Sequence, residues 1–167
     1  MKALSLLCSI CFPVILSAAS PMNWQWVASG EDFACSYKFV RTAAPQGMES
    51  PEYSVLVVYS WEFEGACKDG VSTAEHAQVE QWSSKLYNKL VETKVGFSVA
   101  TIVEPQAIKE YYYVSDLNAF RTLSLTAGEV MIDAKVDYRF MRDLDWTVWQ
   151  ELLEENQQPI EIVGKGK

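Results

Sequence analysis

A single histidine limits the acid–base chemistry available to this chain, because any mechanism that needs an imidazole must use His76. Glu75 precedes it and Glu80 follows four residues later, so a helix here would place a carboxylate near the imidazole, as general-base chemistry requires. However, residues 72–75 (Ser-Thr-Ala-Glu) fit a capping box, which gives Glu75 a structural role. A His–Glu pair on an exposed helix face is usually only a surface contact. We therefore predict no catalysis at His76.

The motifs of several familiar enzyme classes are absent from the sequence. It contains no Gly-x-Ser-x-Gly elbow, no His-Glu-x-x-His helix and no glycine-rich phosphate loop. One histidine and the two cysteines beyond the N-terminal segment are too few for a structural zinc tetrad. The sequence therefore predicts no catalytic residue, no cofactor and no metal, and a protein that is not an enzyme.

The N-terminal segment, residues 1–19, has the features of a secretory signal peptide. Lys2 supplies a positive charge, an apolar run of about 14 residues follows, and small residues precede a cut after Ala19. A retained membrane anchor is the alternative, but it needs roughly 20 apolar residues, and the run is broken at Pro13 and Ser17. We expect cleavage after Ala19 and export to a bacterial periplasm or to the medium, with no membrane span in the mature chain.

Cleavage would sort the four cysteines into two pairs. Cys8 and Cys11 would leave with the signal peptide, whereas Cys35 and Cys67 would reach an oxidising compartment. We predict a disulfide between Cys35 and Cys67. It would close a loop of about 32 residues and stabilise the fold by roughly 3–4 kcal/mol in the chain-entropy model. Two unpaired buried thiols are the alternative.

The chain is acidic, with 14 Lys and Arg against 22 Asp and Glu and a net charge of −8. Removal of Lys2 with the signal peptide would make the net charge one unit more negative. Such a surface repels phosphate backbones and anionic lipids, so we expect no nucleic acid and no membrane surface as a partner. A basic protein is the partner class that this charge favours, and an acidic surface that serves only solubility is the alternative.

The hydrophobic pattern predicts a single α+β domain over residues 20–155, followed by a flexible tail at 156–167. The expected strands are two within 23–41, then 53–63, 95–103, 108–114 and 130–140; the expected helices are 72–93, 116–126 and 145–155. The strands have one exposed face and the helices have one apolar stripe. This combination indicates a two-layer sandwich, an antiparallel or mixed sheet with two to three helices packed on one face.

The strand predicted at 130–140 carries the clearest alternation in the chain. Its apolar row, which ends in Val136, Tyr138 and Phe140, is expected to be buried. Its other row is charged and, with one residue of strand 53–63, forms a candidate partner surface that consists of Glu62, Asp133, Lys135, Asp137 and Arg139. A solvated sheet face with weak cross-strand ion pairs is the alternative interpretation.

Four groups of residues between positions 53 and 153 follow one another in the order helix, hairpin and helix. They are Glu75 with Val79, Trp82 and Leu86; Val95-Gly96; Lys109-Glu110-Tyr111-Tyr112-Tyr113-Val114; and Asp143-x-Asp145-Trp146-x-x-Trp149. This pattern resembles a bacterial family known as domain of unknown function six-nine-five. The chain departs from the family pattern at Phe97, Ser83 and Trp149, where a basic residue, an acidic residue and a tyrosine are expected. The resemblance implies an α+β domain without an assigned activity.

Export, acidity and the absence of catalytic motifs together predict a small binding protein. Its partner would be a protein met in the periplasm, as for an immunity-type inhibitor of an envelope toxin. The alternative is an envelope hydrolase or carbohydrate-binding module that uses tryptophans with His76 or the glutamates beside it. That alternative requires a concave pocket in which Trp24, Trp26 or Trp61 is exposed next to a carboxylate.

Overall fold

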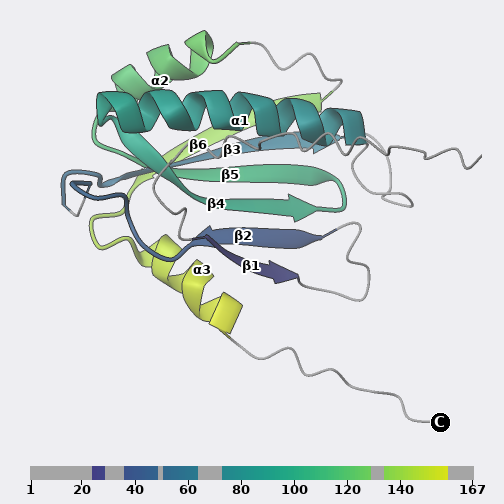
Figure 1. The fold of residues 1–167 in the computed structure, drawn as a ribbon, viewed down its shortest axis with the longest axis horizontal. Coiled ribbons are helices and arrows are strands. Elements are labelled where there is room, and N and C mark those ends of the chain that lie inside the picture. Colours follow the sequence, from purple (N-terminus) through teal and green to yellow (C-terminus); the bar gives the residue numbers. More distant parts are fainter. Residues whose placement is uncertain (1–23, 29–35, 49–50, 64–72, 129–133, 158–167) are drawn as a thin grey trace, which may run out of the picture.

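The computed structural model describes residues 24–28, 36–48, 51–63, 73–128 and 134–157 (Figure 1). The predicted signal peptide, Cys35, Cys67, Asp133 and the part of the predicted tail beyond residue 157 lie outside these residues. For the first strand, residues 24–28, the structure describes the backbone but not the side chains.

The described strands form one antiparallel sheet in the order β1-β2-β4-β5-β3-β6. Their bounds are Trp24–Ala28 (β1), Tyr37–Arg41 (β2), Val55–Phe63 (β3), Gly96–Glu104 (β4), Ala107–Val114 (β5) and Ala134–Arg142 (β6). The hairpin expected from strands 95–103 and 108–114 is β4–β5, which turns at Pro105-Gln106. Of the two predicted alternatives, the antiparallel sheet is the one observed.

Three helices are described, α1 (Thr73–Thr93), α2 (Leu117–Thr126) and α3 (Thr147–Gln157). The predicted α+β sandwich is confirmed, since α1 and α2 pack together on one face of the sheet (Figure 1). Helix α3 lies against the opposite face, near β2 and β4, and adds a partial third layer.

The first core lies between the sheet and the helices α1 and α2. The apolar stripe predicted for α1 is buried and consists of Val79, Trp82, Leu86 and Leu90. It packs on Val57 and Trp61 of β3 and on Ile108 and Tyr112 of β5. Because successive strand residues point to opposite faces, every second residue of these strands reaches this core.

The second core lies under α3. Trp149 and Leu152 pack there with Leu56, Phe97 and Tyr113, which come from the rows of β3, β4 and β5 that face away from α1. The indole Nε1 of Trp149 donates a hydrogen bond of 2.7 Å to the backbone carbonyl of Arg41, which ties α3 to β2. Tyr112 and Tyr113 thus belong to different cores although they are adjacent in sequence.

Asp143 caps the start of α3 and anchors it to the sheet. Its carboxylate accepts hydrogen bonds from the backbone N–H groups of Thr147 (2.9 Å) and Val148 (3.0 Å), which have no partner within the helix. The hydroxyl of Tyr113 donates a third bond of 2.6 Å. Burial alone would raise the pKa of Asp143, but these hydrogen bonds outweigh it and lower the pKa below the ordinary value.

Strand β6 forms an edge of the sheet, and the predicted burial of its apolar row is wrong for the residues that the structure describes. Val136 is 52% exposed, Tyr138 41% and Phe140 52%. Their row faces the same side as α1, but α1 packs over β4 and β5 and does not reach the edge. Apolar and charged residues do alternate along β6, but whether the apolar row is buried depends on the position of the strand in the sheet.

Candidate functional site

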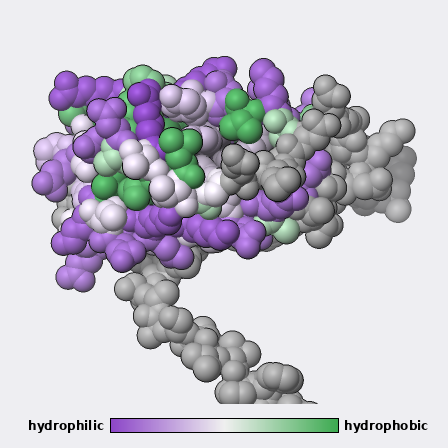
Figure 2. Space-filling model, turned by 90° about the horizontal axis from the view of Figure 1, so that it is seen from above, coloured by the Kyte–Doolittle hydropathy of each residue, from purple (hydrophilic) through white to green (hydrophobic). Residues whose placement is uncertain are grey.

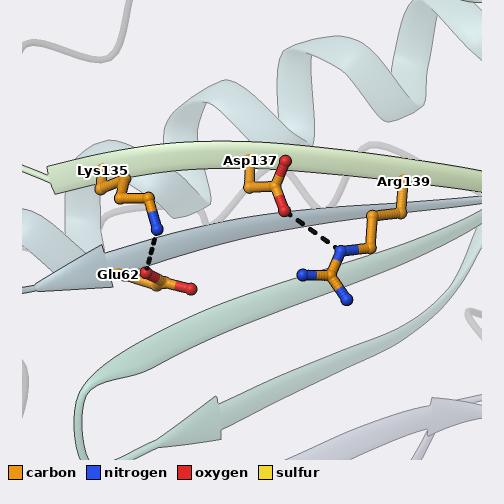
Figure 3. Close-up of polar contacts among 4 residues, drawn as sticks. All are labelled: Glu62, Lys135, Asp137 and Arg139. Carbon is orange, nitrogen blue, oxygen red and sulfur yellow. Dashed lines mark hydrogen bonds and ion pairs between the residues drawn. The ribbon is translucent and has the colours of Figure 1, made fainter.

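The charged partner surface predicted from the sequence assembles on β3 and β6, although Asp133 lies outside the described residues. The Nζ of Lys135 lies 3.0 Å from a carboxylate oxygen of Glu62, its cross-strand neighbour, and the Nε of Arg139 lies 3.2 Å from a carboxylate oxygen of Asp137 (Figure 3). All four side chains are at least 44% exposed. Exposed pairs of this kind contribute little, about 0–1 kcal/mol each.

These four charges also balance one another, two positive against two negative. The four described residues of this surface are therefore ion-paired and balance one another in charge. This outcome is close to the alternative interpretation of the row, a solvated sheet face with ion pairs, one of which (Lys135–Glu62) is cross-strand while the other (Arg139–Asp137) lies within β6. The charged row by itself gives no reason to select a basic partner.

A cavity of about 330 Å³ lies on the opposite face of the sheet from these ion pairs, between α1 and the strands β2, β4 and β5. Its apolar and aromatic walls come from Phe39, Val79, Tyr87 and Ile108. Its polar side chains are His76, Glu80, Ser83, Ser84, Ser98, Thr101 and Glu110. Mostly apolar walls with a few convergent polar groups are typical of small-molecule sites.

Glu110 is the buried carboxyl of this cavity, and only 3% of the residue is exposed. Burial raises the pKa of Glu110 to about 8; hydrogen bonds from Thr101 and Ser83 oppose this increase, and the carboxylate of Glu80 adds to it. The hydroxyl of Thr101 donates to Oε2 of Glu110 at 3.0 Å. At neutral pH the carboxyl is therefore mostly protonated, because desolvation of the charged form costs more than two hydroxyl donors restore.

Strand alternation explains why Glu110 is buried. On β5, Ile108, Glu110, Tyr112 and Val114 share the row that faces α1. A glutamate in an otherwise apolar row is the sequence signal for a buried carboxyl. Glu110 is not among the site residues predicted from the sequence, because carboxylates near the histidine and on exposed rows do not include it; comparison of the two rows of this strand would reveal it.

His76 and Glu80 also line the cavity, one helical turn apart on α1. The sequence predicts only a surface contact for this pair, whereas both residues line the same cavity as the buried Glu110. Among the side chains that the structure describes, no tryptophan lines this cavity. Trp61 is 1% exposed in the first core, and the side chains of Trp24 and Trp26 lie outside the described part.

Behind the cavity, Arg41 places a positive charge between β2 and α1. The residue is 5% exposed; its Nε donates to the carbonyl of Ser98 at 3.0 Å, and its guanidinium lies 5.1 Å from the ring centroid of Tyr87. Stacking of a guanidinium on an aromatic ring is favourable, especially away from water. Arg41 therefore joins the β2–β4 side of the cavity to the helix that covers it.

Among the residues that the structure describes, no group of three or more His, Cys, Asp or Glu side chains could hold a metal ion. Within the same residues, no helix has the length and apolar character needed to cross a membrane.

Comparisons with protein-family models, with curated proteins and with solved structures each gave no significant match. The resemblance to family six-nine-five therefore stays a prediction, and the function of the chain has to be argued from its own geometry.

Proposed function

We propose that this chain is an exported acidic binding protein that recognises a basic protein partner through strand β6. The observation that carries the proposal is the position of β6 at the edge of the sheet, paired with β3 on one side. No strand of the described residues pairs with its other side. An edge strand offers backbone donors and acceptors that a strand of another protein can pair with.

The apolar row of β6 supports the proposal. Val136, Tyr138 and Phe140 follow one another on one face of the strand, each at least 41% exposed, and Met141 is 50% exposed on the other face. From the side on which α2 lies, apolar groups interrupt the hydrophilic surface (Figure 2). Single exposed apolar residues need no explanation, but a row of them along one edge strand is typical of an interaction site.

This row is held in place by its neighbours. The ring of Tyr138 stacks on that of Tyr59 at a centroid distance of 5.5 Å. The guanidinium of Arg121 from α2 lies 5.7 Å from the Tyr138 ring and 5.4 Å from the Phe140 ring. Aromatic side chains that are already ordered lose less conformational entropy on binding, so the row is suited to act as an anchor.

Charge supports the choice of a basic partner through long-range attraction and not through the contact itself. The row that consists of Lys135, Asp137 and Arg139 is locally balanced with Glu62, whereas the whole chain carries −8. A net negative field accelerates the encounter with a basic protein, and salt weakens this effect. The charged row also disfavours pairing of β6 with unrelated strands.

The test is capture of a partner by the tagged full-length chain from extracts of the cells that produce it, at low and at high salt. The double variant Tyr138→Ala/Phe140→Ala should reduce capture of a stoichiometric basic protein at least about tenfold, because buried aromatic anchors dominate binding energy. The matched control is Leu125→Ala on α2, which removes another exposed apolar side chain, 82% exposed.

Three outcomes would contradict the proposal. The first is the absence of any stoichiometric partner at either salt concentration, and the second is equal capture by the β6 variant and by wild type. The third is a purified chain that is dimeric as wild type and monomeric as the β6 variant, since β6 would then serve self-association.

A further inference from the structure

We propose that the cavity between α1 and the strands β2, β4 and β5 binds a small primary amine with an apolar body, whose ammonium group pairs with the carboxylate of Glu110. The cavity lies away from the β6 edge, because β3 and β5 separate β6 from β4 and β2 in the sheet. The proposal is therefore independent of the partner-binding function argued above.

The shape and lining of the cavity favour a small ligand with one polar end. A volume of about 330 Å³ suits a molecule of modest size. Phe39, Val79 and Ile108 provide apolar surface for its body. The polar end would reach the hydroxyl of Thr101 and the carboxyl of Glu110, which lie next to each other on β4 and β5.

The charge of the lining favours a cation at that polar end. The carboxyl groups that line the cavity are those of Glu80 and Glu110, and no lysine or arginine is among the described residues that line it. Arg41 is close, but its Nε is directed to the carbonyl of Ser98 and its guanidinium lies on Tyr87. An ammonium group would thus supply the positive charge that the buried carboxyl needs in order to ionise.

The hydrogen bonds around Glu110 favour the ionised carboxylate over the neutral acid. The Thr101 hydroxyl donates to Oε2, and the hydrogen bond with Ser83 also lowers the pKa of Glu110. Both bonds therefore act in the direction of the anion, and burial is what keeps the group neutral in the free protein. A neutral ligand would leave burial opposed to the hydrogen bonds from Thr101 and Ser83, whereas an ammonium group would stabilise the ionised carboxylate that these bonds favour.

Binding by this route must be coupled to pH. The titratable or charged groups around the cavity are His76, Glu80 and Tyr87 from α1, Arg41 from β2, Tyr59 opposite Glu110 on β3, and Tyr112 on β5. Of these, Glu80 raises the pKa of Glu110, and the cavity residues from β4, Ser98 and Thr101, do not titrate. Burial raises the pKa of Tyr112 well above its ordinary value, so this phenol stays neutral. Below pH 8, binding of an ammonium would then release a proton from Glu110.

The experiment is titration calorimetry of the full chain with butylamine, phenethylamine and tryptamine at pH 6, 7 and 8. The affinity should rise on the order of 50-fold from pH 6 to pH 8, because the ionised fraction of an acid with a pKa of about 8 rises by that factor. Measurements in two buffers of different ionisation enthalpy should show release of about one proton per amine bound at pH 6. The uncharged probe 2-phenylethanol should bind at least about tenfold more weakly than phenethylamine.

Variants assign the effect to Glu110. Glu110→Gln should abolish the proton release and the rise of affinity with pH, with circular dichroism to verify that it folds. Glu92→Gln, an exposed carboxylate of α1 outside the cavity lining, should behave as wild type. His76→Gln should keep the proton release, since His76 is not the paired group.

The proposal is overturned if none of the three amines binds at millimolar concentration. It is also overturned if 2-phenylethanol binds as tightly as phenethylamine, or if folded Glu110→Gln keeps wild-type affinity and pH dependence.

Discussion

Replacement of Glu110 by glutamine separates the cost of a buried carboxyl from the shape of its side chain. In the folded protein, burial raises the pKa of Glu110 from 4.5 to about 8. In the unfolded chain the carboxyl is in water and has its ordinary pKa. Between these two values the folded state holds a proton that the unfolded state has lost, so the free energy of unfolding must fall as the pH rises.

The magnitude follows from the size of the shift. One pKa unit corresponds to about 1.4 kcal/mol, so the buried carboxyl costs about 5 kcal/mol above pH 8 and nothing below about pH 4. Between pH 5 and pH 8 the wild type should therefore lose about 3–4 kcal/mol of stability relative to Glu110→Gln. The amide keeps the size of the side chain but does not titrate, so other titrating groups contribute equally to both proteins and cancel in the difference.

Urea unfolding monitored by tryptophan fluorescence at pH 5, 6, 7 and 8 measures this difference. Glu92→Gln serves as the control, because Glu92 is exposed on α1 and its replacement should shift stability by no more than about 0.5 kcal/mol at any pH. A difference between wild type and Glu110→Gln that stays constant within about 1 kcal/mol from pH 5 to 8 would refute the reasoning. The carboxyl would then be ionised in the fold and the cavity hydrated.

Three further predictions concern the fold and the export signal. Asp143→Ala should lower the free energy of unfolding at pH 7 by about 2 kcal/mol, since it removes the carboxylate that accepts from the first turn of α3 and from Tyr113. Because the pKa of Asp143 lies below its ordinary value, this loss should begin to shrink only as the pH falls through about 4 and should shrink further below it; urea unfolding at pH 7 and at about pH 3 checks it. Gly96→Ala should lower the thermal midpoint and cost about 3 kcal/mol, because a Cβ there would lie 2.5 Å from the backbone oxygen of Tyr113. N-terminal sequencing of the exported chain should begin at Ser20, and thiol titration of the denatured protein should find no free thiol if Cys35 and Cys67 are bridged.

The local elements and the α1 stripe were predictable because they depend on short-range pattern. The spacing of Val79, Trp82, Leu86 and Leu90 reports one helix face whatever the helix packs against. In the same way, the turn at Pro105-Gln106 between two apolar runs reports a hairpin. Such signals are complete within a window of some ten to twenty residues.

The exposure of β6 and the burial of Glu110 depend on strand order, which no local window contains. Val136 and Phe140 alternate as a buried row would, but an edge place beyond α1 leaves them half exposed. Glutamate is an ionisable residue and is expected on the surface. However, β5 is an inner strand under α1, so the row that contains Glu110 is buried. The charged row of β6 was identified correctly as exposed, whereas its self-pairing could be known only from the register of Glu62 with Lys135.

Glu110 and the edge strand β6 have one common cross-strand neighbour on β3, although that residue does not line the cavity. Tyr59 of β3 is the cross-strand neighbour of Glu110 on β5 and of Tyr138 on β6, and its ring stacks on Tyr138. A buried carboxyl that costs about 5 kcal/mol above pH 8 is unfavourable for the fold alone, since an amide of the same size would avoid that cost. Sites that break the rules of stable folding in this way are where function is expected, so Glu110 and the cavity around it are the first places to look for a ligand.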